Sequence, residues 1–186
     1  MKKKVIDVNL IRQQMGSSKS IRRLLKKKWL IVALALILTG LGAALTGVLF
    51  KSGVHILHDW KIYLLQNFSA WLILPLIGAL GGFLSGVLIT RFEPAAGGSG
   101  VSHIMGFLRH KKVPMGIRVG LIKLIAGIIA IGSGFPLGPE GPSVQMGGSI
   151  AWQMSSWLKA PVAFRRVIVA AGGGAGIAAI FSAPIG

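Results

Sequence analysis

Glu140, the last of the 4 Asp and Glu residues in this chain, lies in the stretch GPEGP at residues 138–142. The chain carries 21 Lys and Arg, yet this carboxylate stands alone between apolar segments. An ionisable side chain within a hydrophobic stretch is costly to bury, and it is therefore a candidate for function. The alternative is that Glu140 only caps its helix or faces water at a membrane interface.

Two glycine-rich stretches each precede a short apolar segment. The first is GGSGVSHI at residues 97–104, and the second is FPLGPEGPSVQMGG at residues 135–148. Pro142 suits the first turn of a helix, where its missing N–H costs nothing. A helix N-terminus offers unpaired N–H groups and about half a positive charge, so it can bind an anion without a cationic side chain. The pattern predicts two such sites, with the Ser99 hydroxyl as an added donor in the first.

Glu140 belongs to the second of these predicted anion sites. Its carboxylate would occupy the place where a free anion binds, and it would compete for that place. A proton would neutralise the carboxylate and allow it to leave. Broken helices in membrane transporters direct their ends at anionic substrates in this way. We therefore predict that the Glu140 carboxylate occupies an anion site and leaves it when it is protonated.

The composition is that of a membrane protein. The chain is 53% hydrophobic and 13% charged, whereas soluble domains carry about 25% charged residues. Its mean hydropathy is +0.71. Of the 21 basic residues, 10 lie within residues 1–28 and precede an apolar segment, which favours anionic lipid headgroups over nucleic acid as their partner. The chain has no cysteine, which excludes disulfides, thiolate metal sites and a cysteine nucleophile.

The first half of the chain contains two uncharged segments long enough to cross a bilayer. Residues 29–50 are predicted to span outward from a cytoplasmic N-terminus, because the basic cluster precedes them. Residues 51–69 are then the predicted outer loop, and residues 70–90 return inward. A cleaved signal peptide is rejected because its basic region would be too long. Residues 19–28, KSIRRLLKKK, could form a short amphipathic helix on the inner surface.

The next segment is apolar but too short to span. Residues 97–108 are followed by the basic residues 109–112, which we expect on the cytoplasmic side. Such a segment predicts a re-entrant or partial helix buried in protein or lining a water-filled cavity. A longer helix is expected over residues 114–137, with Arg118 and Lys123 reaching to the interface.

Two further apolar segments complete the chain. They cover residues 141–158 and residues 167–186, with a basic break between them. The sequence stops inside the last of them without a polar anchor. We therefore expect a chain truncated within its fold.

Three stretches together resemble the CLC family of chloride channels and proton-coupled chloride transporters. They are GSGVSHI, GPEGPSVQMGG and GAGIAAIFSAPIG, and they occur in the family's order and spacing. The resemblance covers residues 19–186. It implies an all-α, multi-pass membrane protein with re-entrant and broken helices, the first inverted-repeat half of a CLC-type fold, truncated. Together with the basic cluster before the first span, it divides the chain into a basic cytoplasmic segment at residues 1–28 and a partial CLC-type transmembrane anion transport domain at residues 29–186.

The resemblance also assigns site residues. Ser99 matches the serine whose hydroxyl contacts the central chloride, and Glu140 matches the gating glutamate. The backbone positions that shape the chloride-binding site are Gly98, Gly100, Gly138, Gly141 and Pro142.

Two residues depart from the family's pattern. Pro139 stands where the family usually has Lys or Arg, and Ser102 stands where it usually has proline. The family's site also uses a tyrosine from the second half, and its exchangers use an internal glutamate that would fall just past Gly186. These residues lie beyond this sequence.

The function implied by the resemblance is chloride passage through a path gated by glutamate, either as a voltage-gated chloride channel or as an antiporter. The implied partners are chloride or a similar anion, protons, the lipid bilayer and a second copy in a homodimer. The expected location is the plasma (cell inner) membrane, and no enzymatic activity, catalytic residue, cofactor, metal or nucleic acid is expected. The alternative is an inactive fragment, or a membrane interaction module that requires a separate second half.

Overall fold

The computed structural model describes the backbone of residues 8–183 and the side chains of residues 28–183. Within that range it is built from helices and contains no strand, so the predicted all-α class is confirmed. The elements are α1 (Val8–Asn67), α2 (Ala70–Phe92), the short 3-10 helix η1 (Pro94–Ala96), α3 (Val101–Leu108), α4 (Ile117–Gly132), α5 (Glu140–Trp157) and α6 (Val162–Phe181).

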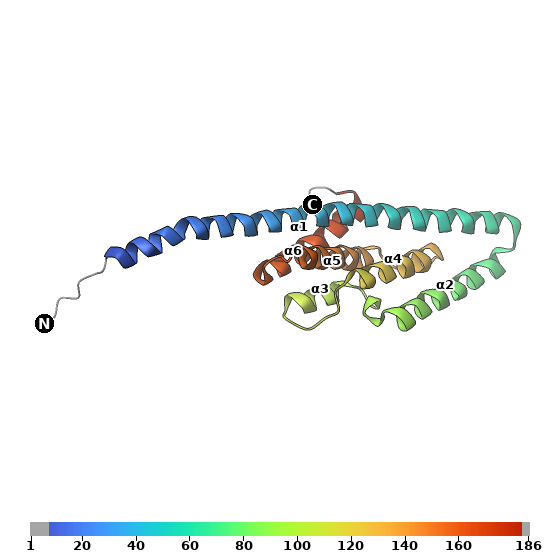
Figure 1. Cartoon of the computed structure of the whole chain (residues 1–186). Helices are drawn as coiled ribbons and strands as arrows, with labels where there is room; N and C mark the ends of the chain where they lie inside the picture. Colours follow the sequence, from blue (N-terminus) through green and yellow to red (C-terminus); the bar gives the residue numbers. More distant parts are fainter. Residues whose placement is uncertain (1–7, 184–186) are drawn as a thin grey trace.

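Helix α1 is a single helix of 60 residues that runs along one side of the other helices (Figure 1). It contains the predicted span at residues 29–50. The predicted loop at residues 51–69 is wrong, because residues 51–67 continue the helix. The physical reason is packing: Val54, inside the predicted loop, packs with Phe50 and Ile128 in one apolar cluster. Residues 19–28 are also helical, but as a continuous part of α1 rather than a separate helix.

Helix α2 matches the second predicted span to within two residues. Within residues 28–183, three helical stretches are long and apolar enough to cross a membrane, namely Lys28–Asn67, Ala70–Phe92 and Val162–Phe181. Large apolar side chains on α1 and α2 stay exposed, and Trp71 is 92% exposed. These exposed apolar faces suit a lipid environment, where they carry no cost.

Helix α5 is the most buried helix of the bundle. Residues 143–151 are buried without interruption, so this helix is enclosed on all sides. Small residues allow its backbone to lie directly against α6: a Cβ on Gly147 would collide with the Gly172 carbonyl, and one on Gly176 would collide with the Ser143 carbonyl. Helices in membranes approach closely where both carry such small residues.

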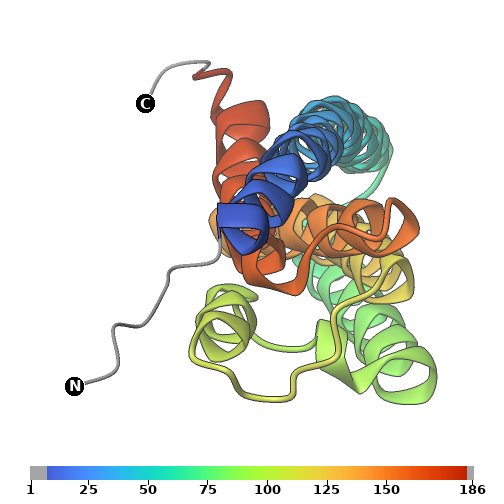
Figure 2. The same cartoon turned by 60° about the vertical axis from the view of Figure 1, so that its left-hand side comes forward.

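Helix α3 lies on the opposite side of α5 and α6 from α1, between two irregular loops (Figure 2). This agrees with the predicted short partial helix at residues 97–108. Helix α4 is shorter than predicted because residues 133–139 form a loop, with Gly134 at φ 103° and prolines at 136 and 139. The start of α5 lies one residue before the predicted one, and α6 starts at Val162 rather than at residue 167.

Candidate functional site

The two glycine-rich stretches meet in one cavity of about 670 Å³. Residues of α2, of the loop before α3, of α4 and of the start of α5 line it. Six of the seven residues predicted for the site are among them: Gly98, Ser99, Gly138, Glu140, Gly141 and Pro142. The seventh, Gly100, is buried directly beside this lining. Residues about forty positions apart in the sequence are thus brought together.

The loop that carries Ser99 depends on glycine. Gly98 and Gly100 have φ of 73° and 79°, in the left-handed region that favours glycine. Gly100 is the N-cap residue of α3, and no side chain of the described residues caps that helix. The first N–H groups of α3 are therefore free of side-chain acceptors, beside the exposed Ser99.

The start of α5 carries Glu140 as its first residue. Pro139 is the N-cap, and Pro142 lies within the first turn, as predicted. The Glu140 side chain is exposed and folds back over Gly138, where any Cβ would collide with its carboxylate. The Ser143 hydroxyl donates a hydrogen bond of 2.7 Å to the Glu140 carbonyl oxygen. The carboxylate therefore lies at the positive end of the α5 dipole.

The two helix starts touch each other through their backbones. A Cβ on Gly141 would collide with the Ser99 carbonyl, and a Cβ on Gly100 would lie 2.5 Å from the Gly141 carbonyl oxygen. Only glycine permits this approach at both positions. The N-termini of α3 and α5 consequently face one cavity from adjacent positions, and both contribute positive potential to it.

Lys123 is a residue of this cavity that the sequence interpretation placed wrongly. It was expected to reach the membrane interface, but it is only 6% exposed. Its Nζ donates hydrogen bonds to the carbonyl oxygens of Ala96, at 2.9 Å, and Gly98, at 2.5 Å. The reason is that position 123 shares the buried face of α4 with Val119 and Ala126. A cation inside an apolar segment marks Lys123 as a candidate for function, but the sequence alone does not distinguish a buried position from one at the interface.

Gln145 was not identified from the sequence. It is fully buried on α5, and its Nε2 donates a hydrogen bond of 2.7 Å to the Ala95 carbonyl oxygen. Gln145 and Lys123, from two different helices, thus hold the carbonyls of Ala95, Ala96 and Gly98. This contact fixes the backbone that leads into Ser99, because three of its carbonyls have buried partners.

The two departures from the family pattern lie outside this cavity's lining. Pro139 lines a separate cavity of about 230 Å³ together with Lys51 and His55 of α1. The Lys51 side chain of α1 therefore lies near the position where the family usually has Lys or Arg. Ser102 lines another cavity, beside α3.

Fold and site together define a membrane-embedded helical protein with two helix N-termini at one cavity, and comparisons with known proteins identify its family. Residues 81–186 match the family model described as Voltage gated chloride channel. The chain belongs to this family and is an integral membrane protein, so the predicted resemblance is confirmed.

Its relatives are transporters. The chain is 37% identical over 173 residues to the H(+)/Cl(-) exchange transporter ClcA of Cronobacter sakazakii, covering 89% of this chain and 37% of the relative. It is 36% identical over 155 residues to the protein of the same name from Vibrio cholerae serotype O1, covering 80% and 33% respectively. The structure resembles that of a slow cyanobacterial Cl-/H+ antiporter, with a TM-score of 0.77 and 39% identity over 83% of this chain and 37% of that one. The chain thus spans about a third of the length of the relatives it matches.

Proposed function

We propose that this chain forms part of a path for chloride or a similar small anion across a membrane, and that Glu140 gates this path. The observation that carries the proposal is the single cavity lined by both Ser99 and Glu140. The family membership supports anion transport, and the names of the relatives favour exchange of chloride for protons over channel conduction.

In this proposal Ser99 and the first N–H groups of α3 bind the anion. Gly98, Gly100, Gly138, Gly141 and Pro142 shape the backbone around it. Backbone amides and a hydroxyl bind an anion weakly enough to release it, as conduction and exchange require. The Lys123 ammonium adds positive charge beside the anion but is held by two carbonyls, so it does not trap the anion in an ion pair.

Glu140 acts as a competitor of the anion. Its carboxylate at the N-terminus of α5 takes the place that a second anion would occupy. A proton removes the negative charge of the carboxylate. The neutral carboxyl group then moves away from the N-terminus of α5 and leaves that position free for an anion. Each cycle couples one proton-dependent movement to the passage of anions. Pro139 removes the family's usual neighbouring cation, which would have favoured the charged form.

The basic residues before the first span support a cytoplasmic N-terminus. We propose that the N-terminus lies in the cytoplasm, that the host membrane is the plasma membrane, and that the protein pairs with a second copy, as the family resemblance implies. A second candidate function is that of a membrane module that works with a separate polypeptide. The observation that favours it is the coverage of only about a third of each relative.

The test replaces Glu140 by Gln, which has the shape of the protonated acid without its charge. The background is a chimera in which this chain replaces the matching third of the Cronobacter relative, reconstituted in vesicles. We expect chloride flux of Glu140→Gln to become nearly independent of external pH and proton transport to be lost. The measurement is simultaneous chloride efflux and proton uptake.

Glu93→Gln is the matched control, since Glu93 precedes η1 and does not line the cavity; it should keep the pH dependence. If chloride flux of Glu140→Gln kept its pH dependence, the gating proposal would be wrong, and Glu140 would act only as a helix cap. The 186-residue chain is measured alone in parallel. Flux in the chimera but not in the chain alone would support the module that needs a second polypeptide.

A further inference from the structure

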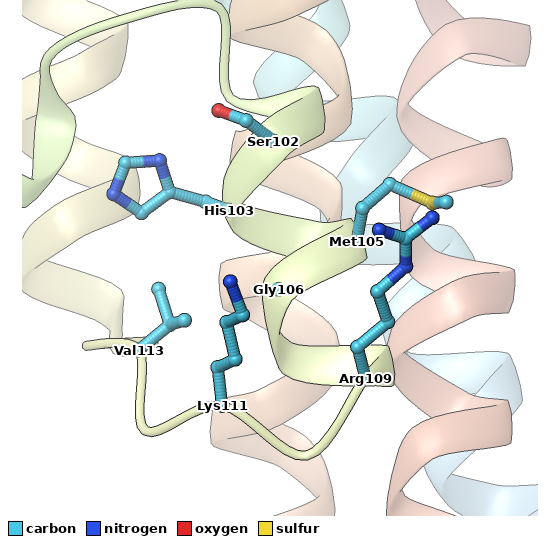
Figure 3. A pocket seen from close by; sticks show the side chains of 7 residues that line it. All are labelled: Ser102, His103, Met105, Gly106, Arg109, Lys111 and Val113. Carbon is cyan, nitrogen blue, oxygen red and sulfur yellow. The ribbon is translucent and has the colours of Figure 1, made fainter.

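A second cavity lies beside α3, between that helix and the turn that follows it (Figure 3). Its volume is about 440 Å³, and it shares no lining residue with the cavity of Ser99 and Glu140. The proposed anion path therefore does not account for it.

The polar side chains that line this cavity can all donate hydrogen bonds. Ser102, His103, Arg109 and Lys111 contribute hydrogen-bond donors, and none of the described lining residues is a carboxylate. In Figure 3 the Lys111 side chain rises from the turn toward Gly106 and the His103 ring. The His103 Nδ1 is buried and has no hydrogen-bond partner among the described residues. A buried polar atom without a partner costs free energy, and a bound ligand would satisfy it.

The turn that supplies Arg109 and Lys111 is fixed by its backbone. The N–H of Arg109 donates to the Met105 carbonyl at 3.0 Å, and that of Lys111 donates to the Gly106 carbonyl at 3.0 Å. His110 between them adopts φ 63° and lies 2.5 Å from an Arg166 nitrogen of α6 through its Nδ1. The position of the two cationic residues thus depends on contacts within the fold rather than on a free loop.

The hydrogen-bond donors of the cavity fit a phosphate group better than chloride. A phosphate offers several acceptor oxygens at once, and the cationic side chains of Lys and Arg are its usual hydrogen-bond donors in proteins. Met105 and Val113 add apolar walls that could contact the carbon atoms attached to such a phosphate. The turn is also the segment predicted at the cytoplasmic membrane surface, where anionic headgroups lie.

We propose that this cavity binds a phosphate group, and that an anionic phospholipid of the cytoplasmic leaflet supplies it. The competing explanation is that residues 109–112 only complement the α3 dipole and attract anionic lipid without a defined site. That explanation makes every cation of the turn equivalent. Under the proposal, phosphate binding requires Arg109 and Lys111, which line the cavity. It does not require Lys112, which does not line it.

The test uses the purified 186-residue chain in nanodiscs of phosphatidylcholine with increasing phosphatidylglycerol. Native mass spectrometry counts the phosphatidylglycerol that each variant retains. We expect Arg109→Gln with Lys111→Gln to weaken retention by about tenfold or more, as the loss of charge-assisted hydrogen bonds implies. Lys112→Gln should change it less than about twofold, as expected for an exposed charge. Helix content by circular dichroism must be the same for all variants.

A second arm distinguishes a lipid from a soluble ligand. Inorganic phosphate and glycerol phosphate are added to the chain in dodecyl maltoside, a detergent that carries no phosphate group, and thermal stability is measured. A shift that disappears in the double variant supports the phosphate site with a soluble source, whereas phosphatidylglycerol retention alone supports the lipid source. Equal losses in the double variant and in Lys112→Gln, or no response to either ligand, would overturn the proposal. Glu140→Gln should retain lipid normally, so this outcome does not depend on the anion path.

Discussion

At the residue scale, Ser99 and Glu140 line the same cavity, although they belong to two separate stretches of the sequence. Their residue types could be identified from sequence because each follows directly from local chemistry: a hydroxyl in a glycine loop and a lone carboxylate before a helix. Lys123 and Gln145 could not be placed in the same way. Their partners are the carbonyls of Ala95, Ala96 and Gly98, which are 25 or more positions away. A lone polar residue in an apolar helix gives the same sequence signal whether it is buried or reaches the interface.

The role of Ser99 can be tested by removing its hydroxyl. In the chimera described above, Ser99→Ala should weaken chloride binding by about tenfold, because a hydrogen bond to a charged ligand is lost. The measurement is isothermal titration with chloride, followed by anion selectivity in vesicles. Ser102→Ala is the matched control, since its hydroxyl lines the other cavity and should leave chloride affinity unchanged. Equal affinity in the two variants would remove Ser99 from the site.

At the scale of elements, the close approach of the loop before α3 to the start of α5 requires glycine at positions 100 and 141. Alanine at Gly100 would have to adopt φ near 79° and would place its Cβ 2.5 Å from the Gly141 carbonyl oxygen. Strain at such a residue costs about 1–3 kcal/mol before the collision is counted. We therefore expect Gly100→Ala to lower the thermal unfolding midpoint in detergent clearly.

Gly40→Ala is its control, because that position on α1 has nothing within 4 Å of a Cβ. Alanine there should preserve or raise the midpoint, since it favours the helix by up to about 1 kcal/mol. If both substitutions leave the midpoint unchanged, the two loops do not touch as described.

The elements themselves were predictable to different degrees. Uncharged runs of span length identified α2 closely, and glycine next to a short apolar run identified α3. Residues 51–67 were misassigned because charges every few residues are compatible with both a loop and a solvent-exposed helix. Only the packing of Val54 against the buried cluster that includes Leu124 and Met146, residues of distant helices, decides in favour of the helix.

At the scale of the whole molecule, the length of α1 has a consequence for topology. Its stretch Lys28–Asn67 contains 40 residues, which corresponds to about 60 Å of helix. A bilayer core is about 30 Å thick, so a substantial part of α1 projects from it or runs strongly tilted. The basic segment before residue 29 favours the cytoplasm, and the far end of α1 is then expected outside.

Single-cysteine labelling can test this topology, because the chain has no cysteine of its own. His58→Cys and Lys111→Cys, both at exposed positions, should react with a membrane-impermeant reagent from opposite sides. Lys159→Cys is the control: it lies in the turn before α6, whose Arg166 contacts His110, so it should label from the same side as Lys111→Cys. Labelling of His58→Cys and Lys111→Cys from one side would contradict the return of α2 across the membrane. If that shared side is the outer one, the basic turn faces away from the cytoplasmic leaflet, and the phosphate cavity beside α3 loses its proposed lipid.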